Sequence, residues 1–206
     1  GSEHSGALAT VKARDLKSAE PWRTVRSFHG RPHYSGWYWA ETTRGLVTYE
    51  SRLELTRLLL ADQDRSVSWI VSQPFHLEGA DPAVGRTRRH VPDFLLFGPS
   101  DLPTIVNVKP PERLEDPKVK ASFAWVEEVL AARGWRHEIW SGADHVLLAN
   151  VRFLSAYRDV RRCDQRALDI VLDGVHAPMT IGGLVDACSS RHSKLVTRAA
   201  VLRHLW

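Results

Sequence analysis

Residues 90–110 read HVPDFLLFGPSDLPTIVNVKP, and this stretch decides the fold. Two apolar runs, FLLF and TIVNV, are separated by turn-forming residues, which predicts two neighbouring β-strands. Asp93 stands at the head of the first run, whereas Asn107 and Lys109 lie at the end of the second. Because side chains alternate between the two faces of a strand, we expect Asn107 and Lys109 to project to the same side. The stretch therefore gathers an acid, an amide and an amine, and a second carboxylate would complete a metal-dependent phosphodiesterase site.

The best candidate for that second carboxylate lies on a helix earlier in the chain. Residues 49–61, YESRLELTRLLLA, space their leucines by three and four, which predicts an amphipathic helix. Glu54 stands between two leucines at the edge of the apolar face. A carboxylate there needs a partner or a metal, because burying it alone is costly. Glu50, one turn earlier, is the weaker candidate and has a supporting role.

The elements around this stretch predict an α/β fold with a central mixed β-sheet flanked by helices. We expect a strand over residues 67–77 that is interrupted at Gln73 and Pro74, a turn-rich loop over 79–89, helices over 116–133 and 143–160, and a strand over 135–140. Domain boundaries are expected after residues 21 and 150, with residues 1–21 as a flexible tail, 22–150 as the main domain and 151–206 as a small helical domain.

Two basic segments have alternative interpretations. Between residues 22 and 39, aromatic and basic side chains alternate, so this segment either stacks bases and holds phosphates or forms an aromatic hairpin that closes the core. Arg86, Arg88 and Arg89 directly precede the Asp93 strand. They either clamp a phosphate backbone or form a solvated loop.

The C-terminal segment carries the whole net charge of +4, because residues 151–206 hold nine Lys and Arg against five Asp and Glu. Three short helices are predicted there, over residues 163–172, 181–188 and 195–205. They fit either a helix-turn-helix whose second helix presents Lys194 and Arg198 to DNA, or a docking surface for a protein. The apolar helical pattern is still running at Trp206, which suggests a continuation into the wing of a winged helix.

Composition limits the class of protein. The chain has 43% hydrophobic and 25% charged residues, typical of a globular protein with a core. No apolar run is long enough to span a bilayer, so we expect a cytoplasmic protein without a membrane partner. The two cysteines, Cys163 and Cys188, are far apart, which argues against a zinc site or a disulfide framework.

The acids and the amine together suggest hydrolysis of a phosphodiester. Mg²⁺, for which Mn²⁺ commonly substitutes, would be held by Asp93, by Glu54 and by the backbone carbonyl of Val108. Lys109 would position the attacking water and stabilise the developing charge. Asn107 offers a neutral oxygen where many such sites carry an acid.

Four blocks of the sequence carry a resemblance to a known family. They are SRLEL at residues 51–55, QPF at 73–75, DFL at 93–95 and VNVKP at 106–110. In order and spacing they resemble TnsA, the endonuclease subunit of heteromeric transposases, within the PD-(D/E)xK nuclease superfamily. The resemblance covers residues 30 to 155 and implies a restriction-endonuclease-like core with a C-terminal winged-helix-like domain. It also adds Gln73 as a supporting candidate.

The resemblance implies a biological role as well. Glu54, Asp93, Asn107 and Lys109 would cleave the 5′ ends of a transposon in double-stranded DNA. The partners would be an integrase-type, TnsB-like transposase and a TnsC-like ATPase regulator, in a bacterial cytoplasm and at the nucleoid when assembled. Two alternatives remain open at this point: a stand-alone restriction or repair nuclease with the same fold, and a non-catalytic DNA-binding assembly adaptor.

Overall fold

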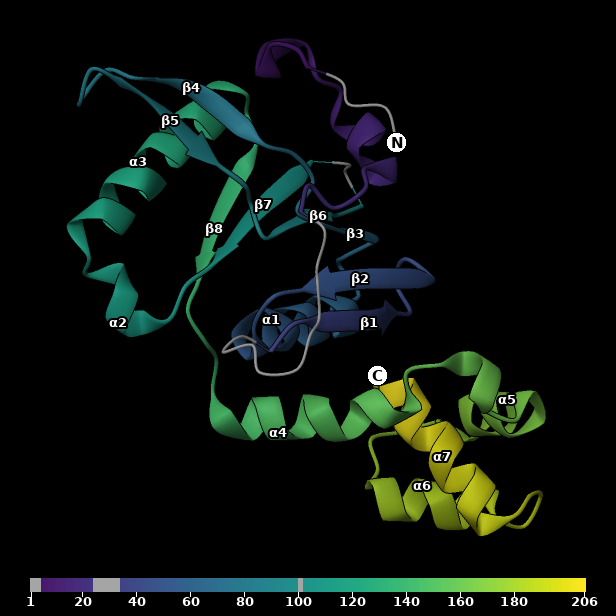
Figure 1. Cartoon of the computed structure of the whole chain (residues 1–206). Coiled ribbons are helices and arrows are strands. Elements are labelled where there is room, and N and C mark those ends of the chain that lie inside the picture. The colour runs from purple at the N-terminus through teal and green to yellow at the C-terminus, as the bar shows by residue number, and fades with distance from the viewer. Residues whose placement is uncertain (1–4, 24–33, 100–101) are drawn as a thin grey trace. The chain divides into compact units, whose positions relative to one another are not determined.

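The computed structural model describes residues 5–23, 34–99 and 102–206. The chain divides into two compact units, Gly1–Ala143 and Asp144–Trp206. Figure 1 shows both, coloured by residue number. The sequence predicts the boundary after residue 150. The structure places it earlier, because helix α4 (His145–Leu154) contacts α7 (Lys194–Leu205) and so belongs to the C-terminal unit.

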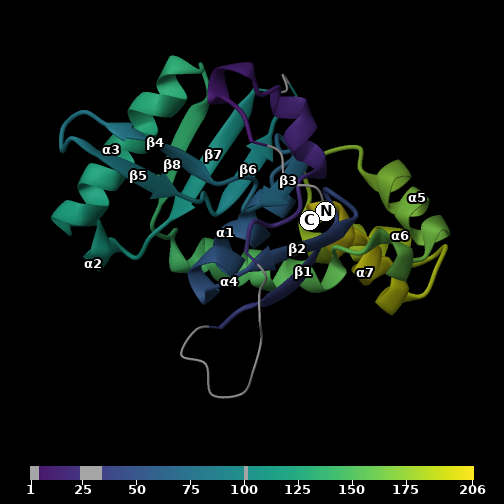
Figure 2. The same cartoon turned by 45° about the horizontal axis from the view of Figure 1, so that its top comes forward.

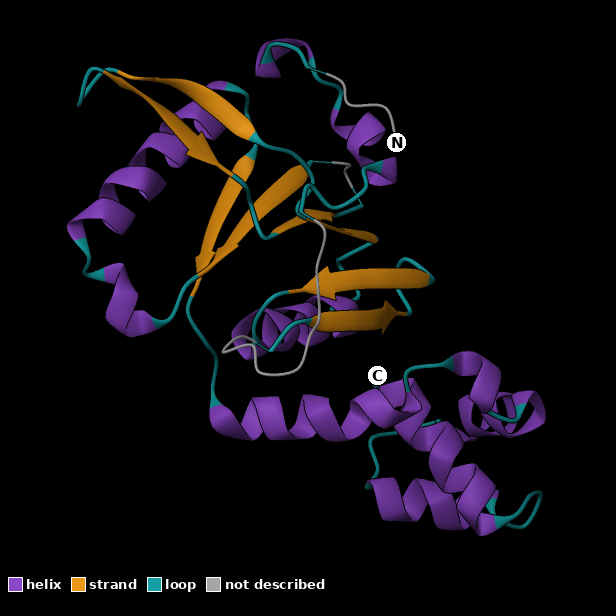
Figure 3. Cartoon of the chain, in the orientation of Figure 1, coloured by secondary structure: helices purple, strands orange, loops and turns teal. Residues whose placement is uncertain are grey.

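The N-terminal unit combines strands and helices, as the cartoon in Figure 3 shows. Its strands are β1 (Gly36–Ala40), β2 (Gly45–Tyr49), β3 (Trp69–Ser72), β4 (Leu77–Asp81), β5 (Arg86–His90), β6 (Phe94–Phe97), β7 (Pro103–Val108) and β8 (Arg136–Trp140). Its helices are the 3-10 turns η1 (Leu8–Thr10) and η2 (Ala13–Ser18) and the α-helices α1 (Arg52–Gln63), α2 (Pro111–Leu114) and α3 (Pro117–Ala132).

Strands β3, β6, β7 and β8 form the central sheet in that order, and Figure 2 shows them side by side. Strand β6 pairs antiparallel with β3 and with β7, whereas β7 pairs parallel with β8. The parallel pair needs a crossover, which α3 provides. Every residue of β6 is buried, as expected of an apolar strand that is covered on both faces. The predicted mixed sheet with flanking helices is confirmed.

The two faces of this sheet have different coverings. On one face, Trp125 and Val126 of α3 pack in the same cluster as Leu95 and Ile105 of the sheet. His137 of β8 pairs with Ile105, so its side chain lies on this face, and the next residue of β8, Glu138, lies on the other. There the Arg57 guanidinium of α1 donates two hydrogen bonds of 2.8 Å to the Glu138 carboxylate. Helix α1 therefore covers the face opposite α3.

The segment predicted as a turn-rich loop, residues 79–89, is a β-hairpin instead. Strands β4 and β5 pair antiparallel, with Glu78 opposite Arg89 and Asp81 opposite Arg86. The indole of Trp125 on α3 donates a 3.1 Å hydrogen bond to the carbonyl of Ala80. The prediction was wrong because these strands have few apolar residues, and cross-strand ion pairs and packing on α3 stabilise them instead.

The N-terminal residues also differ from the expected flexible tail. Leu8, Val11 and Leu16 pack against the core cluster of the central sheet. Arg133, just after α3, donates hydrogen bonds to the carbonyls of Leu8 and Val11. Residues 8–19 are therefore part of the N-terminal unit. This packing was not predictable from the sequence, because 3-10 turns have no periodic apolar pattern.

Only part of the aromatic and basic segment at residues 22–39 can be assessed, since 24–33 lie outside the described residues. The remainder includes β1, which pairs with β2 as a hairpin. Tyr38 is buried, and its hydroxyl donates a 2.7 Å hydrogen bond to Asp62. Tyr38 thus fits the interpretation as an aromatic hairpin that closes the core, whereas Trp22, Tyr34 and Trp37 are exposed and do not.

The C-terminal unit is entirely helical. It contains α4, the 3-10 turns η3 (Ser155–Tyr157) and η4 (Val160–Arg162), and the helices α5 (Gln165–Gly174), α6 (Ile181–Cys188) and α7. The three helices predicted from the sequence are confirmed, and Leu168, Val185 and Val201 bury a small core between them. Residues 144–206 contain no strand, so the wing of the expected winged helix is not confirmed.

Both cysteines lie in this unit as free thiols, and burial raises the pKa of the Cys163 thiol. Across the described part of the chain, no helix has both the length and the apolar character that crossing a membrane requires.

Candidate active site

Asp93 is held at the edge of the central sheet by its neighbours on both sides. Its backbone N–H donates to the carbonyl of Val106, and its own carbonyl accepts from the N–H of Gln73 at 2.9 Å. Its carboxylate oxygen Oδ2 accepts a 2.6 Å hydrogen bond from the N–H of Val108. These three bonds connect Asp93 to the ends of β3 and β7, so the pairing of the strands fixes the carboxylate.

Gln73 supports this arrangement through its backbone. It is buried and has a φ of 45°, a left-handed conformation that is uncommon for a residue other than glycine. Its carbonyl accepts from the N–H of Trp22, and its side-chain oxygen accepts from the N–H of Arg23 at 3.0 Å. Gln73 therefore joins the N-terminal segment to the strand end that holds Asp93.

Glu54 lies in the first turn of α1 and forms a capping box with Ser51. The Ser51 hydroxyl accepts from the N–H of Glu54 and donates a 2.8 Å hydrogen bond to its carboxylate. The other carboxylate oxygen accepts from the N–H of Glu50 at 2.7 Å. This is the S-x-x-E signature of a helix N-terminus, which the sequence contains at residues 51–54. Its carboxylate is thus fixed in position before any ligand binds.

Lys109 directly follows the last residue of β7. Its backbone N–H donates to the carbonyl of Trp140, which anchors it to the end of β8. Because β7 ends at Val108, the strand alternation predicted for Asn107 and Lys109 does not extend to the lysine. Since β6 and β7 run antiparallel, the start of β6 and the end of β7 lie at the same end of the sheet. Asp93 and Lys109 therefore meet there.

The charges of Asp93, Glu54 and Lys109 interact with one another. Burial, and after it the nearby charge of Glu54, together raise the pKa of Asp93 to about 7, against the opposing effects of the Val108 N–H and of Lys109. Burial also raises the pKa of Glu54, and the charge of Lys109 acts to lower it. Two acids and one amine from separate parts of the sequence are thus close enough for their charges to interact.

Asn107 is buried, and its side-chain amide has two histidines as hydrogen-bond partners. It is 1% exposed. Its Oδ1 lies 2.7 Å from Nε2 of His90, and its Nδ2 lies 2.8 Å from Nε2 of His137. Neither histidine was predicted from the sequence to be part of the site. His90 stands three residues before Asp93, and His137 lies on the strand next to β7, a pairing that only the fold reveals.

The supporting residues predicted from the sequence have different outcomes. Glu50 pairs with Arg23 at 3.6 Å, in addition to its backbone bond to Glu54. In the β4–β5 hairpin, Arg88 pairs with Asp81 and Arg89 pairs with Glu78, the latter at 2.9 Å. Arg86 is exposed and makes no ion pair with a described residue. It is the arginine of the three that is available to an external anion.

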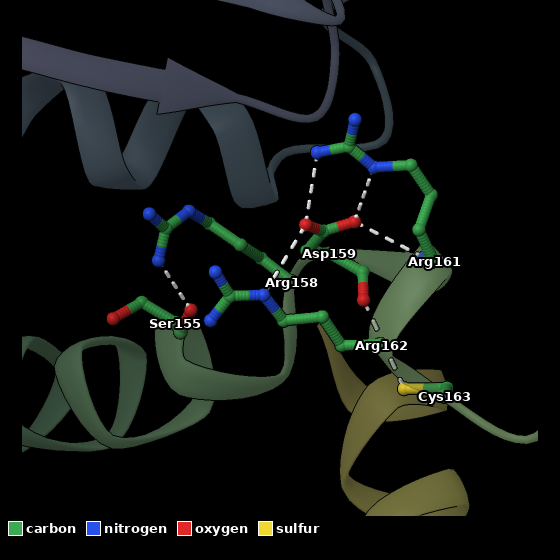
Figure 4. A network of polar contacts seen from close by, with 6 residues as sticks. All are labelled: Ser155, Arg158, Asp159, Arg161, Arg162 and Cys163. Carbon is green, nitrogen blue, oxygen red and sulfur yellow. Dashed lines mark hydrogen bonds and ion pairs between the residues drawn. The ribbon is translucent and has the colours of Figure 1, made fainter.

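The basic residues of the C-terminal unit form a separate set. Lys194 pairs with Asp186 at 2.6 Å, and Arg198 is exposed on the same helix. Figure 4 shows Asp159 between Arg161 and Arg162. The side-chain hydrogen bond from Arg161, with its backbone N–H and the charges of Arg161 and Arg162, lowers the pKa of Asp159 to about 2.

The donor groups present suit a hard divalent cation. Glu54 and Asp93 offer carboxylate oxygens that repel each other, and a cation between them would relieve this repulsion. Among the described residues, no three His, Cys, Asp or Glu side chains gather into a metal site. A third ligand from the protein would therefore be a backbone carbonyl such as that of Val108, as the sequence suggests.

Comparison with known families found a match for part of the N-terminal unit. Residues 64–142 match the family model described as TnsA-like endonuclease N terminal. The match includes Asp93 and Lys109 and begins just after α1, so Glu54 lies outside it. A comparison with curated proteins found no match. The resemblance seen in the sequence is confirmed over residues 64–142, which carry a TnsA-like endonuclease N-terminal domain.

Proposed function

We propose that this protein is a Mg²⁺-dependent DNA endonuclease, the subunit of a heteromeric transposase that cleaves the 5′ ends of a transposon. The observation that carries the proposal is the meeting of Asp93, Glu54 and Lys109 at one end of the central sheet, in a TnsA-like domain. An acid pair can hold the metal ion for phosphodiester cleavage, and a lysine beside it can stabilise the charge that develops on the phosphate.

Each residue of the site has a defined task. Asp93 and Glu54, with the carbonyl of Val108, would hold Mg²⁺ or Mn²⁺, which when bound supplies charge neutralisation and an activated water. Strand pairing and the capping box position the two carboxylates in advance, so little reorganisation is needed. Lys109 orients the attacking water and stabilises the negative charge that develops on the phosphate.

The surroundings of the site support a DNA substrate. The exposed Arg86 on β5 would contact the phosphate backbone, and Arg88 and Arg89 keep the β4–β5 hairpin in shape through their ion pairs. In the C-terminal unit, Lys194 and Arg198 would contact either DNA or a protein partner. The resemblance to TnsA supports a TnsB-like transposase and a TnsC-like ATPase as partners.

One observation favours a second candidate function, a non-catalytic DNA-binding adaptor. Both carboxylate oxygens of Glu54 already accept hydrogen bonds within the capping box, so this acid has a structural task as well. In an adaptor the fold would be kept for assembly, and metal binding would be lost.

Cleavage of DNA carrying transposon ends, in the presence of the partner transposase, tests the proposal. We expect D93A and K109A each to abolish 5′-strand cutting in Mg²⁺, while K118A, which removes an exposed lysine of α3, cuts normally. Full activity of D93A or K109A would refute the proposed site.

Calorimetry with Mn²⁺ separates the alternatives. The nuclease should bind Mn²⁺ in the wild type and lose binding in D93A. Absence of Mn²⁺ binding by the wild type, with salt-dependent DNA binding retained, would select the adaptor. Sequence-specific cutting by the isolated wild type would identify a stand-alone nuclease.

A further inference from the structure

Four side chains form a continuous hydrogen-bonded chain beside the proposed nuclease site. We call this set the histidine chain, and its members in order are Glu127, His137, Asn107 and His90. The Glu127 carboxylate lies 2.7 Å from Nδ1 of His137, and the Asn107 amide connects Nε2 of His137 to Nε2 of His90. The histidine chain runs from helix α3 across β8 and β7 to the end of β5.

The carboxylate at one end sets the direction of every hydrogen bond. An ionised carboxylate can only accept, so Nδ1 of His137 must carry the proton that points to Glu127. In a neutral imidazole the other nitrogen is then an acceptor, so Nε2 of His137 accepts from the NH₂ group of Asn107. This orients the amide with its oxygen toward His90. The Asn107 oxygen in turn accepts from Nε2 of His90, which must therefore carry its proton.

Packing holds both imidazoles in place. The ring of Phe123 on α3 meets His90 and His137 edge to face, with centroid distances of 6.1 Å in each case. The side chain of His137 is only 1% exposed. Burial is the largest of the effects that lower the pKa of His90, and the positive charges of Lys109 and Arg23 act in the same direction. The hydrogen bond from His90 to Asn107 also joins this imidazole to the end of β7, which Lys109 directly follows.

We propose that the histidine chain holds His90 as a neutral imidazole with its proton on Nε2, and that Nδ1 of His90 is a hydrogen-bond acceptor within the nuclease site. This inference rests on the proposed function. Glu127, His137 and Asn107 are then positioning residues. Asn107 acts in the site by orienting His90, because its oxygen is already engaged by the imidazole.

The role of Nδ1 follows from what surrounds it. Nε2 of His90 is used by Asn107, and no hydrogen bond joins Nδ1 to any other described residue. Lys109 is a donor whose charge acts on this imidazole. An acceptor at this place can bind either the ammonium of Lys109 or the water that the lysine orients.

The tautomers can be measured without any nuclease activity. Long-range ¹H–¹⁵N spectra of the metal-free full chain distinguish a histidine proton on Nδ1 from one on Nε2. The protein has ten histidines. The signals of His90 and His137 would be assigned by their loss from the spectra of H90Q and H137Q. We expect Nε2–H for His90 and Nδ1–H for His137. The reverse tautomer at either residue, or a doubly protonated His90 at pH 7.5, would overturn the proposal.

Variants test the connection along the chain. In N107D the amide donor is replaced by an acceptor, so Nε2 of His137 must gain a proton, and we expect the His137 signals to change to those of the imidazolium form. In E127Q the group that can only accept is replaced by an amide that can also donate, so we expect the Nδ1–H form of His137 no longer to be the single tautomer. E128Q alters the neighbouring exposed glutamate and is the matched control. Unchanged His137 signals in N107D would contradict the proposal.

Activity then tests the role of Nδ1 separately. A glutamine at position 90 can still donate to Asn107, but it offers no acceptor in place of Nδ1. We expect H90Q to cut about 10–100-fold more slowly than the wild type, the size typical of a residue that supports a metal site, with an unchanged melting temperature. Wild-type cutting by H90Q would overturn the role of His90 while the proposed function stands. An inactive wild type would instead count against the proposed function, and the spectra would still decide the histidine chain.

Discussion

Replacement of Asp93 by asparagine removes a carboxylate that is buried and close to a second acid. Burial and the charge of Glu54 raise the pKa of Asp93 from 3.8 to about 7. As the pH rises, the unfolded chain loses this proton near pH 4, whereas the folded chain keeps it until about pH 7. Ionised Asp93 therefore destabilises the folded state, and this effect grows between pH 4 and pH 7 and is complete above pH 7.

The magnitude follows from the size of the shift. A difference of about three pKa units, at 1.36 kcal/mol each, corresponds to roughly 4 kcal/mol at pH 8. At pH 5, which is only about one unit above the unfolded pKa of 3.8, the destabilisation is about 2 kcal/mol. Asparagine keeps an oxygen that can accept from the N–H of Val108, so the hydrogen bond is preserved. We expect D93N to be more stable than the wild type by about these amounts.

Urea unfolding in EDTA, followed by tryptophan fluorescence at pH 5 and pH 8, measures the difference. The control is D62N. The Asp62 carboxylate accepts hydrogen bonds from Tyr38 and from the backbone of Glu41 and Thr42, so its replacement should lower the free energy of unfolding at both pH values. A stability difference between D93N and the wild type that is negative, or that stays the same at both pH values, would refute the reasoning.

Three further predictions concern the scaffold of the site, each measured by urea unfolding of the full chain. S51A loses the cap of α1 and the hydroxyl bond to Glu54, so we expect the free energy of unfolding to fall by about 1 kcal/mol. R57M leaves the half-buried Glu138 without its bidentate partner, and we expect a loss of about 1–3 kcal/mol. Deletion of residues 1–19 exposes part of the core cluster, and we expect a lower unfolding midpoint.

Each of these has a control and a contradicting result. S66A changes an exposed serine outside the helices, and a loss in S51A no larger than in S66A would argue against the capping box. For Arg57, the double variant R57M/E138Q should recover part of the loss, and simple additivity would argue against the ion pair. An unchanged midpoint after the deletion would restore the interpretation of a flexible tail.

Local patterns in the sequence predicted many of the strands and helices of this protein. The apolar runs around Asp93 and Lys109 predicted two paired strands, and the structure has them as β6 and β7. Leucine spacing predicted α1, and the three C-terminal helices were placed to within two residues at each end. These elements were predictable because burial imposes a period of two or of 3.6 residues on the sequence itself.

The β4–β5 hairpin shows where such patterns fail. Its strands depend on ion pairs between Glu78 and Arg89 and between Asp81 and Arg88, and on packing against α3. None of these contacts leaves a local apolar period. The same holds for the N-terminal 3-10 turns, because their hydrogen-bond partners, Arg133 and Trp69, lie far away in the chain.

The site divides in the same way. The sequence alone predicted the candidate groups, since an acid, an amide and a lysine at the ends of two adjacent strands, with an acid on a preceding helix, could be identified from residue type and spacing. Only the tertiary structure decided their states. The pKa of Asp93 depends on burial and on Glu54, and the partners of Asn107 are histidines of β5 and β8. The physical reason is that charge interactions, desolvation and side-chain hydrogen bonds depend on distances in space, which the sheet sets by pairing β7 with β8 and by bringing α1 and α3 to its opposite faces.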